Sequence, residues 1–127
     1  MKVRVLIVED EPGVAMAMRF ALGLAKCEAQ IAETSAEAIK MADSGKFDLI
    51  TLDMNLRGES GLTLCRELKQ NPRLKGTPIV MVSGRSTLED QQNGLDAGAV
   101  DYITKPFNTF EFAPRLLSHI KPTLVHA

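Results

Sequence analysis

Each of four apolar segments of the chain ends on side chains that could take part in chemistry. These side chains are three carboxylates, a hydroxyl and an ammonium, namely Glu9, Asp10, Asp53, Ser83 and Lys105. Three carboxylates gathered in one place raise one another's pKa values unless a cation joins them. Mg²⁺ suits such a site, because it prefers oxygen ligands and retains several waters. The set indicates phosphoryl transfer, in which Asp53 attacks while Lys105 and the cation neutralise phosphoryl oxygens.

The apolar segments are the strands that must position these side chains. Residues 3–8 (VRVLIV) are apolar almost throughout, which is typical of a strand that is covered on both faces in a parallel sheet. The same reasoning predicts further strands at residues 29–32, 49–53, 78–82 and 100–104. A helix follows each strand, at residues 12–25, 36–43, 61–70, 87–97 and from 109 onwards. Five βα units with right-handed crossovers predict an α/β fold, a (βα)5 doubly wound three-layer sandwich.

In a parallel sheet the carboxyl ends of all strands lie at one edge, so the five polar side chains should meet there. Each of them alone also has a structural explanation. Asp53 and Ser83 can cap the turns that follow their strands. Glu9 and Asp10 can be ordinary acidic residues at a helix start, and Lys105 before a proline can be a solvated loop residue. Their agreement at four separate strand ends favours the chemical interpretation.

Helix boundaries are predicted from capping residues. Thr34 with Glu37, and Ser86 with Glu89, match the capping-box pattern, and Asn108 precedes the last helix. Within that last helix a proline, Pro114, stands where an interior N–H would be needed, so we expect a kink or a late start. Ser60 is the expected cap of the third helix.

Composition excludes several classes of function. The chain has 127 residues, which fits one domain, and a net charge of −1, which argues against direct binding of nucleic acid. Cys27 and Cys65 match no zinc pattern and are expected to be reduced thiols. The longest apolar stretch, residues 14–25, is interrupted by Arg19 and is too short to span a membrane. With no signal-peptide pattern at the N-terminus, we expect a cytoplasmic protein without a membrane partner.

The chain resembles the receiver domains of response regulators in two-component signalling, over essentially its whole length. The matching segments are VLIVEDEP, LDMNLRGESG around Asp53, VMVSG and GAVDYITKPF. The resemblance implies a flavodoxin-like sheet of strand order 2-1-3-4-5 and a cis peptide bond between Lys105 and Pro106. It also implies that Asp53 accepts a phosphoryl group from a phosphohistidine on a histidine kinase or histidine phosphotransfer protein.

The resemblance further assigns roles around Asp53. It implies that Asp10, Asp53 and the backbone carbonyl of Asn55 bind Mg²⁺, with Glu9 assisting through a water molecule. Such a domain catalyses only its own phosphorylation and dephosphorylation and is not otherwise an enzyme.

Phosphorylation in this family acts as a two-state switch. By resemblance, Ser83 hydrogen-bonds the phosphoryl group, Lys105 forms a salt bridge to it, and Tyr102 changes rotamer. The surface that signals to a downstream protein is then formed by the fourth helix, the fifth strand and the fifth helix.

Several residues depart from the family pattern, among them Glu9, which replaces the commoner Asp of the acidic pair. Arg57 stands where a proline is usual, so we expect a less restrained loop and an extra cation near the site. The fourth helix contains no Lys or Arg, and Val100 replaces a frequent acid. These changes argue against the salt-bridged dimer of receivers that carry winged-helix DNA-binding domains. We therefore expect a monomer or a weak dimer.

The first helix carries a single charge, Arg19, between residues 14 and 25, so it cannot bury all its sides against one sheet face. We expect an exposed apolar patch around Met16 and Phe20 that binds a partner helix. Pro106 and Phe107 are expected to belong to the same partner-binding surface.

The expected boundaries are a receiver domain at residues 1–121 and a tail, or the start of a linker, at residues 122–127. One alternative is a Mg²⁺-dependent phosphohydrolase with an aspartyl nucleophile. Such enzymes normally carry an Asp-x-Asp pair, and the second position here is Asn55. Another alternative is a receiver fragment of a larger regulator or hybrid kinase.

Overall fold

The structure is a computed structural model that describes residues 2–120 and contains a five-stranded parallel sheet. Its strands are β1 (Arg4–Val8), β2 (Glu28–Ala32), β3 (Leu49–Leu52), β6 (Ile79–Ser83) and β7 (Asp101–Thr104). They lie in the order β2-β1-β3-β6-β7, and every neighbouring pair is parallel. β4 (Asn55–Leu56) and β5 (Glu59–Ser60) form a separate small hairpin, so β6 and β7 are the fourth and fifth strands of the sheet. The strand order is therefore the predicted 2-1-3-4-5. The predicted fold class is confirmed.

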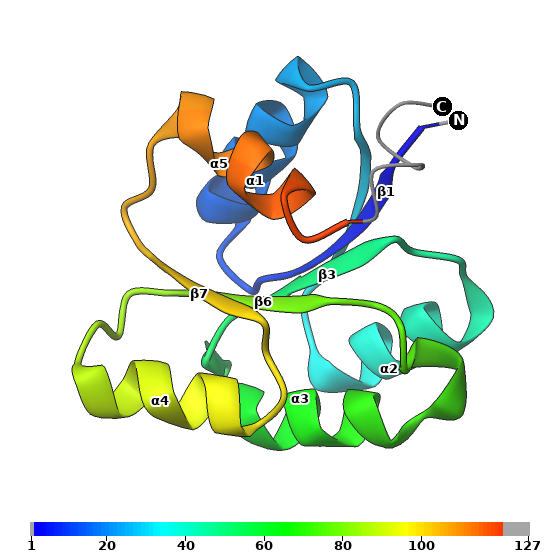
Figure 1. Ribbon diagram of the computed structural model, residues 1–127, viewed down its shortest axis with the longest axis vertical. Coiled ribbons are helices and arrows are strands. Elements are labelled where there is room, and N and C mark those ends of the chain that lie inside the picture. Colours follow the sequence, from blue (N-terminus) through cyan, green and yellow to red (C-terminus); the bar gives the residue numbers. More distant parts are fainter. Residues whose placement is uncertain (1, 121–127) are drawn as a thin grey trace.

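Helices cover both faces of the sheet (Figure 1). On one face lie α1 (Pro12–Leu24) and α5 (Thr109–Leu117), and on the other lie α2 (Ser35–Ser44), α3 (Gly61–Gln70) and α4 (Leu88–Asp96). Neighbouring strand residues point to opposite faces, so Leu49 packs in the core with α1 and α5 while Ile50 packs in the core with α2 and α3. Both faces are therefore buried, which explains why the strands are apolar throughout. None of the helices in residues 2–120 combines the length and apolar character needed to cross a membrane.

Several predicted helix starts are confirmed. Pro12 occupies the first turn of α1, where its missing N–H costs nothing. Thr34 caps α2 by accepting a hydrogen bond from the Glu37 N–H at 3.1 Å. Asn108 caps α5 by accepting from the Glu111 N–H at 3.1 Å. Each cap satisfies an N–H group that has no partner within its own helix.

The predicted start of α4 is wrong by one residue. Its cap is Thr87, whose hydroxyl oxygen accepts from the Asp90 N–H at 3.0 Å and donates to the Asp90 carboxylate at 2.7 Å. The helix accordingly begins at Leu88. Ser86 with Glu89 fits the same capping pattern as Thr87 with Asp90, so sequence spacing alone does not separate these overlapping pairs.

Of the kink or late start expected for the last helix, the late start does not occur, and the kink stays a prediction. α5 begins at Thr109, directly after its Asn108 cap, and includes Pro114. Proline lacks an N–H, so the carbonyl of Phe110 receives no bond from the residue four positions on. The helix persists because Phe112, Ala113 and Leu116 are buried against the sheet.

The structure also contains two elements that the sequence did not predict. They are a 3₁₀ turn at Pro72–Leu74 and the hairpin of β4 and β5. The Lys105–Pro106 bond is cis, as the resemblance implied. The predicted domain boundary after residue 121 lies outside the described residues.

Candidate functional site

Three carboxylates meet at the carboxyl edge of the central strands. Glu9 and Asp10 follow β1, Asp53 follows β3, and each offers an oxygen that lies within 4.8 Å of the others. Glu9 is 1% exposed and Asp53 is 7% exposed. β1 and β3 are neighbours in the sheet, with Val8 paired to Leu52, so their ends deliver the acids to one place. The predicted clustering of these residues is confirmed.

Lys105 joins the cluster from the end of β7. Its Nζ lies 2.8 Å from Asp53 Oδ2 and 2.5 Å from Glu9 Oε1. Burial raises the pKa of Glu9, although the bond to Lys105 opposes this effect. Burial would lower the pKa of Lys105, but its hydrogen bonds to Asp53 and Glu9 outweigh burial and raise it. Lys105 is thus held as an ammonium and is not a solvated loop residue.

One ammonium does not balance three carboxylates, so the site keeps an excess of negative charge. Its donors are carboxylate oxygens, which are the ligands that hard divalent cations such as Mg²⁺ prefer. The acidic residues present therefore fit a magnesium ion. Glu9, Asp10 and Asp53 form the only such cluster of potential metal ligands among residues 2–120.

The hairpin of β4 and β5 follows Asp53 immediately. Its two turn residues, Arg57 and Gly58, have φ angles of 48° and 82°, which is typical of a type I′ turn. The Asn55 N–H donates to Asp53 Oδ1 at 3.1 Å, and the Arg57 N–H donates to Asp10 Oδ2 at 3.1 Å. The residue that replaces proline therefore bonds directly to the site. The expectation of a less restrained loop stays a prediction.

A glycine that we did not single out closes this loop. Gly61 begins α3, and a Cβ on it would overlap the backbone carbonyl of Asp53. Its N–H donates to the Met54 carbonyl at 2.7 Å. The preceding Ser60 caps α3, as predicted, by accepting from the Thr63 N–H at 3.3 Å. The sequence signal is a glycine at the first helical position, where no turn requires it.

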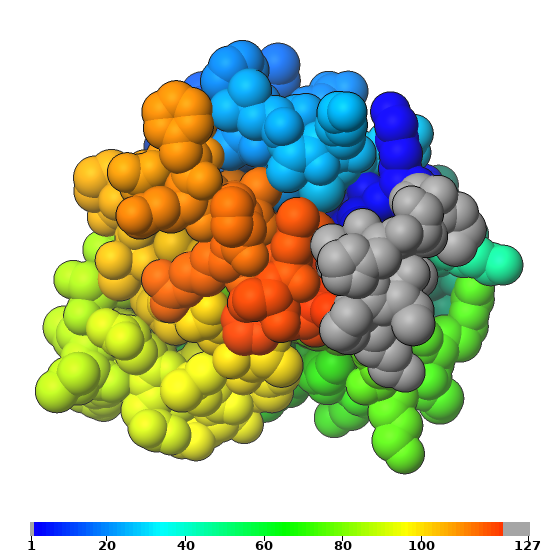
Figure 2. All heavy atoms as spheres, turned by 45° about the horizontal axis from the view of Figure 1, so that its top comes forward, coloured from blue at the N-terminus to red at the C-terminus, as the bar shows by residue number. Residues whose placement is uncertain are grey.

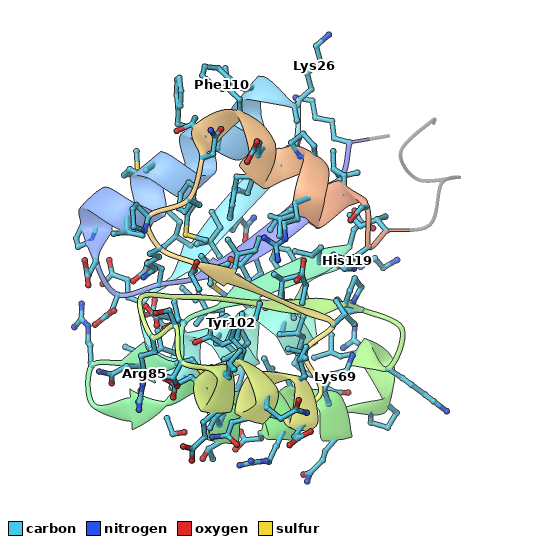
Figure 3. All side chains as sticks on the ribbon, turned by 60° about the vertical axis from the view of Figure 1, so that its left-hand side comes forward. Lys26, Lys69, Arg85, Tyr102, Phe110 and His119 are labelled. Atoms are coloured by element: carbon cyan, nitrogen blue, oxygen red, sulfur yellow. The ribbon has the colours of Figure 1, made fainter. Side chains whose placement is uncertain are left out.

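Ser83 and Tyr102 lie at the edge of the site towards α4. Ser83 ends β6 and is buried, and its hydroxyl oxygen accepts from the Arg85 N–H at 3.3 Å. Tyr102 lies between β7 and α4 (Figure 3), where its hydroxyl donates to the Arg85 carbonyl at 2.5 Å. Its ring packs closely against Gly94, where a Cβ would lie 3.0 Å from the nearest ring atom. Burial raises the pKa of the Tyr102 phenol.

Comparisons with known proteins agree on the family. The response regulator receiver domain family matches residues 5–117. This chain is a response regulator receiver domain. The response regulator ArlR of Staphylococcus saprophyticus is 35% identical over 118 residues, which cover 93% of this chain and 52% of that protein. The phosphate regulon transcriptional regulatory protein PhoB of Pseudomonas aeruginosa is 37% identical over 119 residues, which cover 94% of this chain and 52% of that protein.

Solved structures show the same fold over nearly whole chains. A putative response regulator from Chloroflexus aurantiacus superimposes with a TM-score of 0.89 at 31% identity, covering 94% of this chain and 98% of that chain. The chemotaxis response regulator CheY4 of Vibrio cholerae gives a TM-score of 0.88 at 27% identity, covering 94% and 100% of the two chains. The receiver spans about half the length of the curated relatives it matches.

The receiver exposes apolar side chains on α1, away from the acidic cluster. Met16 is 56% exposed and Phe20 is 64% exposed, whereas Met18 and Leu22 on the opposite side of the helix are buried. α1 lies beside α5 on this face of the molecule (Figure 2). The predicted exposure of an apolar α1 patch is confirmed.

A groove of about 540 Å³ separates the start of α1 from the loop that follows β7. Its walls include Val14 and Ala17 on one side and Lys105, Pro106 and Phe107 on the other. The Phe107 ring stacks on Phe112 of α5, with ring centroids 4.3 Å apart. The groove therefore runs from the α1 surface to the lysine of the acidic cluster.

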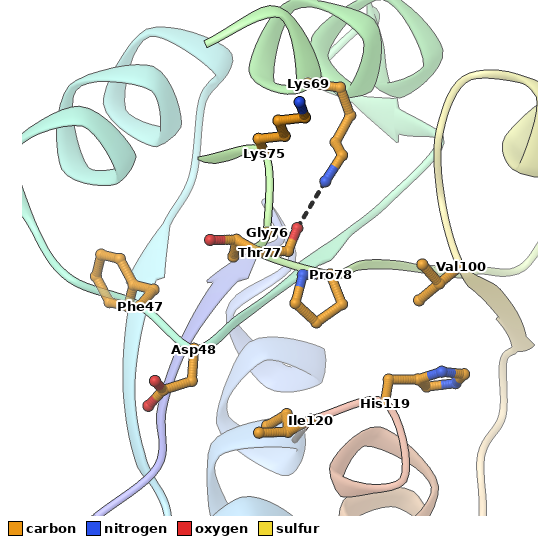
Figure 4. Close-up of a pocket in the computed structure, with 10 residues that line it drawn as sticks. All are labelled: Phe47, Asp48, Lys69, Lys75, Gly76, Thr77, Pro78, Val100, His119 and Ile120. Atoms are coloured by element: carbon orange, nitrogen blue, oxygen red, sulfur yellow. Dashed lines mark hydrogen bonds between the residues drawn. The ribbon is translucent and has the colours of Figure 1, made fainter. Parts of the chain in front are cut away.

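A second cavity, of about 430 Å³, lies at the opposite edge of the sheet (Figure 4). Pro78, Val100 and Ile120 are among its lining residues, together with Lys69. The Lys69 Nζ donates to the carbonyls of Thr77 at 2.8 Å and Leu74 at 3.3 Å. This ammonium is bonded to backbone carbonyls, and the cavity contains no group in common with the acidic site.

Proposed function

We propose that this receiver accepts a phosphoryl group on Asp53 from a phosphohistidine of a histidine kinase or histidine phosphotransfer protein, in a reaction that requires Mg²⁺. One observation carries the proposal: the buried Asp53 carboxylate contacts Lys105 inside a cluster that has excess negative charge. A buried acid in such a place is expensive unless a cation and a reaction use it.

The residues divide the reaction between them. An Asp53 oxygen attacks phosphorus while the bond from phosphorus to the histidine nitrogen breaks, which leaves an acyl phosphate on Asp53. Lys105, already 2.8 Å from Asp53, neutralises charge on the transferred oxygens. Asp10, Asp53 and the Asn55 carbonyl would hold Mg²⁺, with Glu9 acting through water. When bound, Mg²⁺ offsets negative charge on the phosphoryl oxygens.

Phosphorylation would then reorganise the edge of the site near α4. The added group carries about −1.5 to −2 charges and three acceptor oxygens. The Ser83 hydroxyl would bond to it, and the Tyr102 side chain would respond by a change of rotamer. The output surface would be α4, β7 and α5, which binds a downstream protein or output domain.

Partners would dock on the face that carries α1. Met16 and Phe20 would pack against the helix that bears the histidine, and Pro106 and Phe107 would line the groove that leads to Lys105. We further propose that this domain works in the cytoplasm as a monomer or weak dimer, does not itself bind nucleic acid, and catalyses only its own phosphorylation and dephosphorylation.

Incubation with acetyl phosphate and Mg²⁺ tests the acceptor role. Intact-protein mass spectrometry should show the gain of one phosphoryl group, and peptide mapping should place it on Asp53. Asp53→Asn, or removal of Mg²⁺ with a chelator, should abolish the gain, whereas Asp101→Asn should not. Steady turnover of many phosphomonoesters without a stable acyl phosphate would contradict the proposal and support the hydrolase.

A charged residue on α1 tests the docking surface separately. Phe20→Glu should slow phosphotransfer from a phosphorylated histidine phosphotransfer protein, because it places a charge in an apolar contact. The same variant should react with acetyl phosphate at the wild-type rate, since Phe20 lies outside the acidic cluster. Equal phosphotransfer rates in the variant and the wild type would exclude this part of α1 as the docking surface.

A further inference from the structure

The hairpin after Asp53 holds two of the proposed magnesium ligands through backbone groups. The Asn55 N–H bonds to Asp53 Oδ1, and the Arg57 N–H bonds to Asp10 Oδ2, each at 3.1 Å. The second bond is long-range, because it joins the hairpin tip to the second residue after β1. It engages one of the two oxygens of the Asp10 carboxylate.

The bond to Asp10 depends on the conformation of residue 57. Arg57 has a φ angle of 48°, in the left-handed region that few side chains adopt. Proline is restricted to a φ angle of about −65° and has no N–H to donate. A proline at position 57 therefore removes both the turn and the bond, so this receiver orients Asp10 through a contact that proline at this position does not permit.

Side chains secure the hairpin against the loop that follows β2. The Arg57 guanidinium lies 3.0 Å from the Glu33 carboxylate, and the Ser35 N–H donates to the Glu59 carboxylate at 3.3 Å. Arg57 and Glu33 are each about half exposed, so their ion pair contributes little free energy by itself. The ion pair holds the Arg57 guanidinium beside Glu33 and away from the acidic cluster.

We propose that Arg57 is a positioning residue for Mg²⁺, acting through its backbone N–H and its left-handed conformation to hold the Asp10 carboxylate in the orientation that binds the ion. This inference rests on the proposed function, in which Asp10 and Asp53 are ligands. Hydrogen bonds that orient ligating carboxylates commonly change metal affinity by about 10-fold to 100-fold when they are lost. Residue 57 thus sets the magnesium concentration at which this receiver becomes competent.

A comparison of four proteins distinguishes the effect of the residue 57 backbone from the effect of its charge. Mg²⁺ affinity is measured by isothermal titration calorimetry on the wild type, Arg57→Pro, Arg57→Val and Arg57→Asn. Asn and Val both remove the guanidinium and keep the N–H, but only Asn favours the left-handed conformation, and Asn-Gly is a preferred type I′ turn. We expect Arg57→Asn to bind Mg²⁺ at least as tightly as the wild type.

Arg57→Pro should bind about 10-fold more weakly, and Arg57→Val should also bind more weakly than Arg57→Asn. Circular dichroism melts check that the variants fold. If Arg57→Pro does not fold, the Mg²⁺ affinities of Arg57→Val and Arg57→Asn still test the inference. Equal affinities in all four proteins would overturn the inference, as would an Asn variant as weak as the Val variant. A wild type that binds no Mg²⁺ would instead refute the proposed function.

Discussion

Two ion-pair clusters in this receiver use the same kinds of groups with opposite results. At the carboxyl edge of the sheet, Lys105 bridges Asp53 and Glu9. At the start of β7, Asp101 accepts two bonds from the Arg115 guanidinium of α5, at 2.9 and 2.8 Å. The His119 ring nitrogen lies 2.9 Å from the same carboxylate. Both clusters link segments that are distant in sequence.

Charge balance and burial separate the two clusters. In the Asp101 cluster one carboxylate faces one guanidinium that is half exposed, and Arg115 holds the pKa of Asp101 well below its usual range. In the Lys105 cluster three acids face one ammonium, and burial raises the pKa of Glu9. The balanced pair of Asp101 and Arg115 does no more than join β7 to α5. An unbalanced buried cluster retains charge that a cation or a phosphoryl group can use.

Removal of Lys105 should have the largest effect on stability. Lys105→Met leaves buried carboxylates without their cation, which should cost about 3 kcal/mol in the free energy of unfolding measured with urea. Added Mg²⁺ should recover part of the loss, because it replaces the missing charge. Lys69→Met is the matched control, since Lys69 bonds only to backbone carbonyls. Its cost should be smaller and insensitive to Mg²⁺.

Magnesium itself should stabilise the wild type. At a concentration 100 times its Kd, an ion that binds only the folded state adds about 2.7 kcal/mol. Thermal melts with and without Mg²⁺ should show this shift in the wild type and in Asp101→Asn, and should show a reduced shift in Asp53→Asn. A shift of the same size in all three proteins would place the ion elsewhere.

The Asp101 cluster should contribute less, and its contribution should depend on pH. Asp101→Asn should lower the free energy of unfolding by about 1 kcal/mol near pH 7, because the bidentate partner is partly exposed. The folded pKa of Asp101 lies below the unfolded value of about 3.9, so its stabilisation is present above that pH and is lost as the pH falls. Urea titrations at several pH values should show the difference between the variant and the wild type narrowing in acid.

The smallest effect concerns a buried polar atom that belongs to neither cluster. The Thr51 hydroxyl in β3 is buried and, within residues 2–120, has no hydrogen-bond partner. Thr51→Val replaces it with an apolar group of the same shape and should raise the free energy of unfolding by up to about 1 kcal/mol. A loss of stability would mean that the hydroxyl has a partner, such as a water molecule.

Much of this receiver was predictable from its sequence, because the relevant signals are local. Continuous apolar runs predicted the buried strands, and the Thr34 and Asn108 caps marked the starts of α2 and α5. The polar residues at four strand ends predicted the acidic cluster, because a parallel sheet collects its carboxyl ends at one edge. The start of α4 was misplaced because the pairs Ser86 with Glu89 and Thr87 with Asp90 both match the capping pattern, and the sequence does not show which pair forms.

The loop after Asp53 shows where local signals end. The sequence indicated that Arg57 replaces a usual proline, and from this we inferred a looser loop. In the folded chain the Arg57 N–H reaches Asp10, which is 47 positions away in the sequence, and the guanidinium reaches Glu33. Composition and spacing establish which groups a strand end supplies. Bonds between residues so far apart in the sequence form only because the packing of the whole sheet brings the ends of β1, β2 and β3 together.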